Sequence, residues 1–200
     1  MSTSMHLYER LGLFSTGVTL GVFLLMLHLL MFVKSAAMQQ FLVKFPRNQK
    51  IGQVILGIGM AWFWLLIAPE GKGWISFLAL DMTEFNAVKP ILRLLLPVIF
   101  VFVAMSIREF LSVRALGLLG LLVAQPLLDA AFLKDPMSRL LIPFWTYGLV
   151  IASLFFVGMP YLFRDAVTWA TASAARWKAL CLGGLAYGLI LIVSTFAFWR

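Results

Sequence analysis

The sequence has 200 residues, of which 62% are hydrophobic and 12% are charged. Soluble domains are about half apolar and about a quarter charged, so this composition excludes an ordinary soluble domain and indicates a membrane protein. The net charge of +8 does not indicate nucleic acid binding, because no long basic run is present. Cys181 is the single cysteine, which excludes an intrachain disulfide.

Six apolar runs are long enough to cross a membrane, since a spanning helix needs about 20 mostly apolar residues. Unbroken apolar runs such as Val22–Leu27 exclude the alternation of a β-barrel. We therefore predict an all-α integral membrane bundle of six transmembrane helices with short connections, forming a single transmembrane domain over residues 1–200. The predicted spans are Gly12–Val33, Ile51–Ala68, Ile91–Ile107, Ala115–Leu133, Leu140–Phe163 and Ala179–Trp199.

The first span carries Gly17, Gly21 and His28 within about 40° of one another on a helix. Helices in lipid associate through small residues and a few polar contacts, so this face is expected to pack against another helix. His28 is a secondary candidate for a functional group, as a proton shuttle or a metal contact. The alternative, which we favour, is a histidine that is hydrogen-bonded to a neighbouring helix.

The connection after the first span, "KSAAMQQFLVKFPRNQK", carries four basic residues and no acid. The first, third and fifth connections together carry nine basic residues, against seven at the other end of the bundle. Because basic residues concentrate on the cytoplasmic side, we expect both termini to lie outside the cytoplasm. The expected location is a cell membrane, specifically a bacterial inner membrane.

The connection Pro69–Pro90 contains "WISFLAL", Trp74–Leu80, which is too short to span and is expected to be interfacial or re-entrant. Glu70–Gly73, "EGKG", resembles a phosphate-binding loop only superficially, because it lacks the required spacing. Lys89 and Arg93 lie one turn apart at the start of the third span. They are expected to extend to the lipid headgroups rather than bind an anion.

Tryptophan and tyrosine side chains near the span ends are typical of an aromatic belt at the membrane surface. The predicted members are Trp62, Trp64, Trp74, Tyr161, Trp177 and Trp199. The turn before the fourth span, "SIREF" and the residues after it, carries Arg108, Glu109 and Arg114. It could hold a lipid phosphate, but a basic connection that fixes topology is the simpler interpretation.

The fourth span presents two faces. Gly117, Gly120 and two alanines form a small-residue stripe, while Gln125 and Asp129 point about 140° away from it. An acid within a span is costly and usually faces protein or water, so Asp129 with Gln125 is the candidate proton or cation site. Pro126 frees a backbone carbonyl nearby. The alternative is structural, because Asp129 lies four residues from the predicted span end, where water or Lys134 can satisfy it.

Arg164–Lys178, between the last two spans, is alanine-rich and carries Trp169 and Trp177. It is expected to form a helix at the level of the headgroups. The last span carries Gly184 and Gly188, a G-x-x-x-G step that predicts another packing face. His28 and Asp129 are predicted to lie about 15 Å apart along the membrane normal, so they do not form a pair.

No catalytic motif, metal-ligand spacing or cofactor-binding pattern is present in the sequence, so we predict no catalytic residue, metal or cofactor. The favoured hypothesis is a small non-catalytic membrane component, either an assembly subunit or a module that binds lipid or protein. The alternative is a proton- or cation-coupled carrier or channel that uses Asp129 and Gln125. A membrane enzyme acting on a lipid-linked substrate is the third. Expected partners are the lipid bilayer and a membrane protein or second copy of the chain, with no nucleic acid.

Overall fold

The structure, a computed structural model, describes residues 8, 11–68, 79–106 and 109–199. Its described part is all-α and contains six helical segments long and apolar enough to cross a membrane, which confirms the predicted fold class. The chain is thus a multi-pass membrane protein with six candidate spans. The helices that cross are α1 (Leu13–Val33), α3 (Gln49–Leu66), α4 (Lys89–Ser106), α5 (Leu111–Ala131), α6 (Leu141–Gly158) and α8 (Ala174–Phe198). Short 3-10 helices η3 (Thr83–Val88) and η4 (Met137–Leu140) precede α4 and α6.

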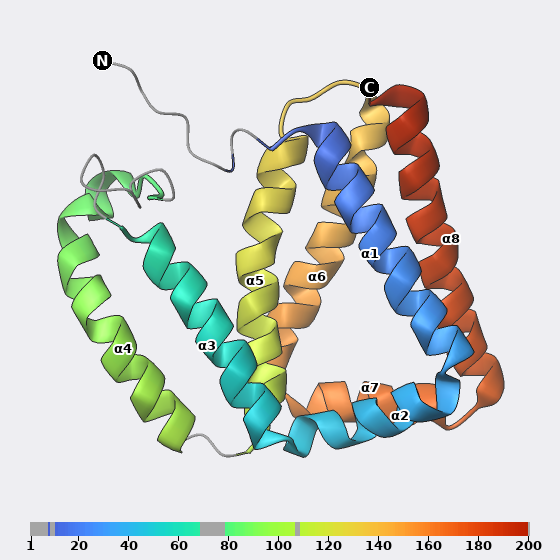
Figure 1. The fold of residues 1–200 in the computed structure, drawn as a ribbon, viewed down its shortest axis with the longest axis horizontal. Helices are drawn as coiled ribbons and strands as arrows, with labels where there is room; N and C mark the ends of the chain where they lie inside the picture. Colours follow the sequence, from blue (N-terminus) through green and yellow to red (C-terminus); the bar gives the residue numbers. More distant parts are fainter. Residues whose placement is uncertain (1–7, 9–10, 69–78, 107–108, 200) are drawn as a thin grey trace.

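Helix α5 lies between α3 and α6, and α1 pairs with α8 along most of its length (Figure 1). Helix α4 packs on α3 at the edge of the molecule. Of the six candidate spans α5 is the most buried and α4 the least. The small-residue stripe of α5 explains its central place, because it allows close contact with a neighbour on one face while larger side chains fill the other.

Two short helices lie crosswise beneath the spans, at the end opposite the start of α1 and the end of α8 (Figure 1). Helix α7 (Tyr161–Thr171) confirms the short helix predicted between the last two spans. Helix α2 (Ser35–Lys44) was not predicted, because ten residues with two glutamines match neither a span nor a clear amphipathic stripe. The two helices contact each other, and we refer to α2 and α7 together as the platform.

Several span boundaries differ from the predicted ones. Helix α6 ends at Gly158 rather than Phe163, because Pro160 cannot continue the helix. Helix α5 begins four residues early, where the buried Ser112 hydroxyl donates to the Phe45 carbonyl at 2.6 Å in η1 (Phe45–Arg47). Helix α8 begins at Ala174 instead of Ala179, since a helix can extend past the apolar core. Most of Trp74–Leu80 and all of Glu70–Gly73 lie outside the described residues.

The glycines of the α1–α8 and α5–α6 contacts have almost no space above them. A methyl group added at Gly21 would lie 2.8 Å from Ile192, and one at Gly117 would lie 2.7 Å from the Ser153 carbonyl oxygen. The same construction brings further glycines against side chains of the facing helix. These pairs are Gly17 with Thr195 and Trp199, Gly120 with Ser153, Gly184 with His28, and Gly188 with Leu25. The helix backbones therefore approach closely at both contacts.

Indole N–H groups join elements that are distant in the sequence. Trp177 donates to the Met31 carbonyl at 3.1 Å, and Trp199 donates to the Ser138 hydroxyl at 2.8 Å. Trp62 and Trp64 make comparable bonds, described below. The positions of these rings near the span ends are those expected of an aromatic belt. Their N–H groups, however, donate hydrogen bonds to protein atoms.

Candidate functional site

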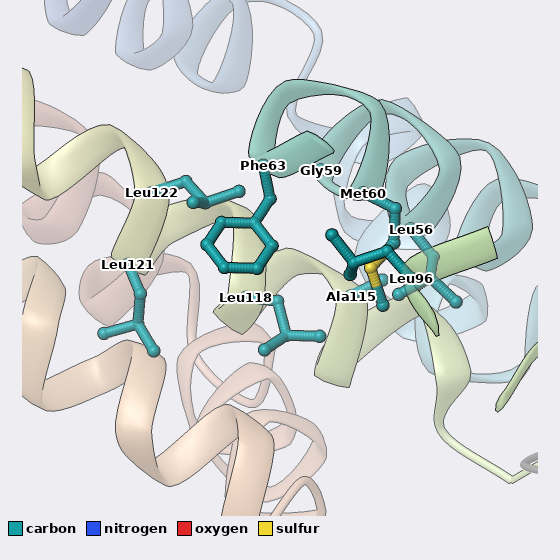
Figure 2. A pocket seen from close by; sticks show the side chains of 9 residues that line it. All are labelled: Leu56, Gly59, Met60, Phe63, Leu96, Ala115, Leu118, Leu121 and Leu122. Atoms are coloured by element: carbon teal, nitrogen blue, oxygen red, sulfur yellow. The ribbon is translucent and has the colours of Figure 1, made fainter. Parts of the chain in front are cut away.

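An apolar groove lies between α3, α4 and α5 (Figure 2). Its volume is about 330 Å³, at the lower end of the range of about 300–1,000 Å³ typical of ligand pockets. Phe63 of α3 faces Leu118 and Leu122 of α5, while Met60 lies beside Leu96 of α4. The groove is lined by Leu56, Gly59, Met60, Phe63, Leu96, Ala115, Leu118, Leu121 and Leu122. None of these side chains can donate or accept a strong hydrogen bond.

The groove exists because small residues stand where helices α3 and α5 face each other. A methyl group added at Gly59 would meet only the Leu122 side chain, at the ordinary contact distance of 3.8 Å. Ala115 provides a second small wall on α5. Larger residues at these two positions would fill the space, so the local sequence leaves the groove open.

A second hollow of about 210 Å³ lies between α3 and α4. It is lined by Gly57, Met60, Ala61, Trp64, Leu96, Pro97 and Phe100. Met60 and Leu96 line both this hollow and the groove, so the two spaces adjoin on either side of the α3–α4 contact. Gly57 and Gly59 are two residues apart, about 200° around the helix, so each opens toward a different space.

Arg93 and Trp64 hold α4 against α3 beside the second hollow. Pro97 has no N–H group, so the Arg93 carbonyl lacks its usual partner in α4. The Trp64 indole donates to this carbonyl at 3.2 Å. In return, the guanidinium carbon of Arg93 lies 3.8 Å from the centre of the Trp64 ring, a cation–π contact. Arg93 is therefore held against Trp64, and its extension to the headgroups stays a prediction.

Two arginines near the groove carry a buried Nε atom without a hydrogen-bond partner in the described part of the chain, Arg93 and Arg114. Arg93 lies one turn before Leu96 on α4, and Arg114 directly precedes Ala115 on α5; both of these neighbours line the groove. Because α4 and α5 run in opposite directions, the two arginines lie at opposite ends. A buried donor left unpaired costs about 1–3 kcal/mol, so both positions favour an acceptor.

Gln125 and Asp129, the predicted proton or cation site, continue the α5 face that carries Leu118 and Leu121, but neither lines the groove. Asp129 is exposed and lies two residues before the end of α5, nearer the end than predicted, and Gln125 is half-buried. Asp129 interacts with Tyr8. Their role in proton or cation binding stays a prediction.

The Tyr8 hydroxyl accepts a hydrogen bond from the Trp62 indole at 2.6 Å, which ties the segment before α1 to α3. Burial raises the pKa of Tyr8, the bond from Trp62 opposes this shift, and the negative charge of Asp129 adds to it. The net direction is upward. The ionisation of Tyr8 therefore depends on the charge of Asp129, at the end of the bundle opposite the platform.

The His28 ring Nδ1 lies 2.8 Å from the Leu24 carbonyl oxygen of its own helix, and the ring packs against Gly184 of α8. The His28 ring thus makes its hydrogen bond within its own helix, α1, and not to a neighbouring helix as we had favoured from the sequence. His28 lies near the platform and Asp129 near the opposite end, as predicted. Among the described residues no three His, Cys, Asp or Glu side chains lie close enough to hold a metal ion.

Sequence reasoning missed the groove because its lining residues are ordinary apolar residues. One signal was available: Pro97 frees the carbonyl of the residue four positions before it, Arg93, and so marks a place where α4 needs an outside donor. Comparison with protein-family models, curated proteins and solved structures gives no match for this chain.

Proposed function

We propose that the chain is a small non-catalytic membrane component that binds one acyl chain of a membrane lipid in the groove between α3, α4 and α5. The observation that carries the proposal is a lining made of apolar side chains alone. Catalytic sites and sites for polar ligands combine apolar walls with a few polar groups that fix orientation. A wall without such groups favours hydrocarbon.

The depth of the groove supports a lipid as its occupant. Gly59 lies near the middle of α3, and Leu121 lies at the middle of α5. At that depth the surroundings are lipid chains, which contact the membrane-embedded helices directly. A transmembrane helix is about 10–12 Å across with its side chains, too wide for a space of about 330 Å³. A single acyl chain is narrow enough.

We further propose that the protein lies in a bacterial inner membrane with the platform toward the cytoplasm and both termini outside. The connections and helix ends on the platform side carry nine basic and two acidic residues, a net charge of +7. The termini, connections and helix ends on the opposite side carry seven basic and six acidic residues, a net charge of +1. The cytoplasmic leaflet is the anionic one, so it attracts the more basic end.

The carrier hypothesis has less support, because neither Gln125 nor Asp129 lines the groove. Asp129 lies at the end of its helix, where water can reach it. The enzyme hypothesis depends on Glu70–Gly73 and on the turn before α5, and the first of these lies outside the described residues. Lipid binding by the groove therefore accounts for more of the observed geometry.

The test is to fill the groove and count bound lipids. In Gly59→Leu the new side chain occupies the space next to Leu122, whereas Gly148→Leu adds the same side chain to α6 where nothing lies within 4 Å of the added carbon. Native mass spectrometry of protein extracted in mild detergent should show one retained lipid for the wild type and for Gly148→Leu. Gly59→Leu should retain much less. Equal retention by all three proteins would refute the proposal.

A further inference from the structure

The Arg93–Trp64 pair lies near the ends of two candidate spans, α3 and α4. Trp64 is two residues before the end of α3, and Arg93 is in the second turn of α4. The stacking contact of 3.8 Å fixes the guanidinium at the height of the indole ring. Met60 lies one turn deeper on α3 and lines the groove, so the path from Arg93 to the groove is about one helical turn.

The stacking contact with Trp64 positions the guanidinium of Arg93. Its Nε is buried and has no hydrogen-bond partner, and no carboxylate of the described residues forms an ion pair with it. The nearby Asp81 carboxylate accepts bonds from the Thr83 backbone N–H at 2.8 Å and from Asn86 at 2.7 Å. Lys89, one turn from Arg93, is buried and its charge acts on the Asp81 carboxylate. Arg93 is therefore the candidate anion-binding group at this end of the α3–α4 contact.

A guanidinium stacked on an aromatic ring keeps its planar edge of N–H donors free, and this edge matches the oxygens of a phosphate. We infer that the lipid in the groove is a phospholipid whose phosphodiester group pairs with Arg93 while one acyl chain descends past Met60 and Leu96. This inference rests on the proposed function, because it identifies the headgroup of the lipid proposed there.

The test compares two lipids with the same chains, dioleoyl phosphatidylglycerol and dioleoylglycerol, of which only the first carries a phosphate. Each is added in equal amount to protein delipidated in detergent, with no other lipid present, and the bound lipid is counted by native mass spectrometry. The wild type should prefer the phospholipid. Arg93→Gln should reduce that preference about tenfold, the effect of losing a charge-assisted hydrogen bond, and should still retain dioleoylglycerol.

Three further variants make the result specific to Arg93. Arg93→Lys keeps the charge but loses the planar edge, so it should show an intermediate preference. Arg139→Gln removes an arginine from η4 at the same end of the bundle and should behave as the wild type. Arg114→Gln removes the arginine at the other end of the groove and should also keep the preference. Melting temperatures of all variants exclude a general loss of folding.

The outcomes separate the two proposals. Equal retention of both lipids by the wild type would overturn the headgroup assignment and leave acyl-chain binding intact. A preference lost in Arg114→Gln but kept in Arg93→Gln would also overturn it, because the phosphate would then lie at the platform end. Retention of neither lipid by the wild type would overturn the proposed function itself.

Discussion

Glycine has opposite consequences in two regions of this molecule. Between α1 and α8 the glycines lie against side chains or backbone of the facing helix, as Gly21 does against Ile192. On α3, Gly57 and Gly59 meet only Phe100 and Leu122, at 3.8 Å. In the first region a missing side chain lets two backbones approach, and in the second it leaves a space.

The difference follows from what the facing helix offers. Helices α1 and α8 both carry glycines spaced by four, and a carbon added at Gly21 or at Gly188 would lie 3.3 or 3.2 Å from the carbonyl oxygen of the other. Gly57 and Gly59 instead face single side chains, Phe100 of α4 and Leu122 of α5, at ordinary contact distance. Glycines of α1 and α8 that meet at one level therefore bring two backbones together, whereas on α3 the glycines leave space beside a larger side chain.

The largest expected effect comes from the tightly packed region. Gly184→Leu would drive a side chain into the His28 ring, whereas Gly183→Leu, one residue earlier on the same helix, meets nothing within 4 Å. We expect Gly184→Leu to lower the stability by about 1–3 kcal/mol, the usual cost of overpacking, and Gly183→Leu to leave it unchanged. Thermal unfolding in detergent measures both. Equal melting temperatures would show that α1 and α8 are not closely packed.

A smaller effect is expected from Trp64→Phe in the loosely packed region. Phenylalanine keeps an aromatic face for Arg93 but cannot donate to the Arg93 carbonyl, so about 1 kcal/mol of hydrogen bonding is lost. Hydrogen exchange of the α4 amides should accelerate while exchange in α8 is unchanged. Trp62→Phe, which loses its bond to Tyr8 instead, serves as the control and should leave α4 protected. Slow exchange of α4 in Trp64→Phe would contradict the account of this contact.

The smallest effect concerns Tyr8, in the segment before α1 that contacts α3. Asp129→Asn removes a negative charge that raises the pKa of Tyr8, so that pKa should fall. Because the pKa is raised in the folded chain, the neutral phenol contributes stability below the ordinary tyrosine pKa, and this is lost as the pH rises through the raised value. Ultraviolet titration of tyrosinate, with Tyr8→Phe as the reference, measures the shift. An unchanged pKa would place Asp129 too far away to act on Tyr8.

The spans were predictable because hydrocarbon imposes one strong rule, a long run of apolar residues. Helix α1 begins one residue from its predicted start and ends at the predicted Val33. Boundaries were less accurate where a helix extends past the apolar core, as α8 does at Arg176. Helix α2 was missed because ten residues at a membrane surface need no pattern as strong as that of a span.

The groove could not be predicted, because it depends on which helices are neighbours. The sequence does not distinguish whether Leu118 and Leu122 face lipid or the protein core. They line the groove only because α3 lies beside them. The contact of Arg93 with Trp64 could not be predicted either, because it joins residues 29 positions apart on different helices. Polar residues within a span, such as Asp129, were easy to identify in the sequence, but their function could not be predicted from it.

The central claim is that an acyl chain lies in the groove between α3, α4 and α5, and photolabelling tests it most directly. A phospholipid with a diazirine at mid-chain is incorporated into nanodiscs with the protein, illuminated, and its attachment sites are mapped by peptide mass spectrometry. We predict attachment concentrated at Leu56–Phe63 and Leu118–Leu122, lost in Gly59→Leu and kept in Gly148→Leu. Labelling spread evenly over the lipid-facing sides of α4, α6 and α8, and unaffected by Gly59→Leu, would contradict the claim.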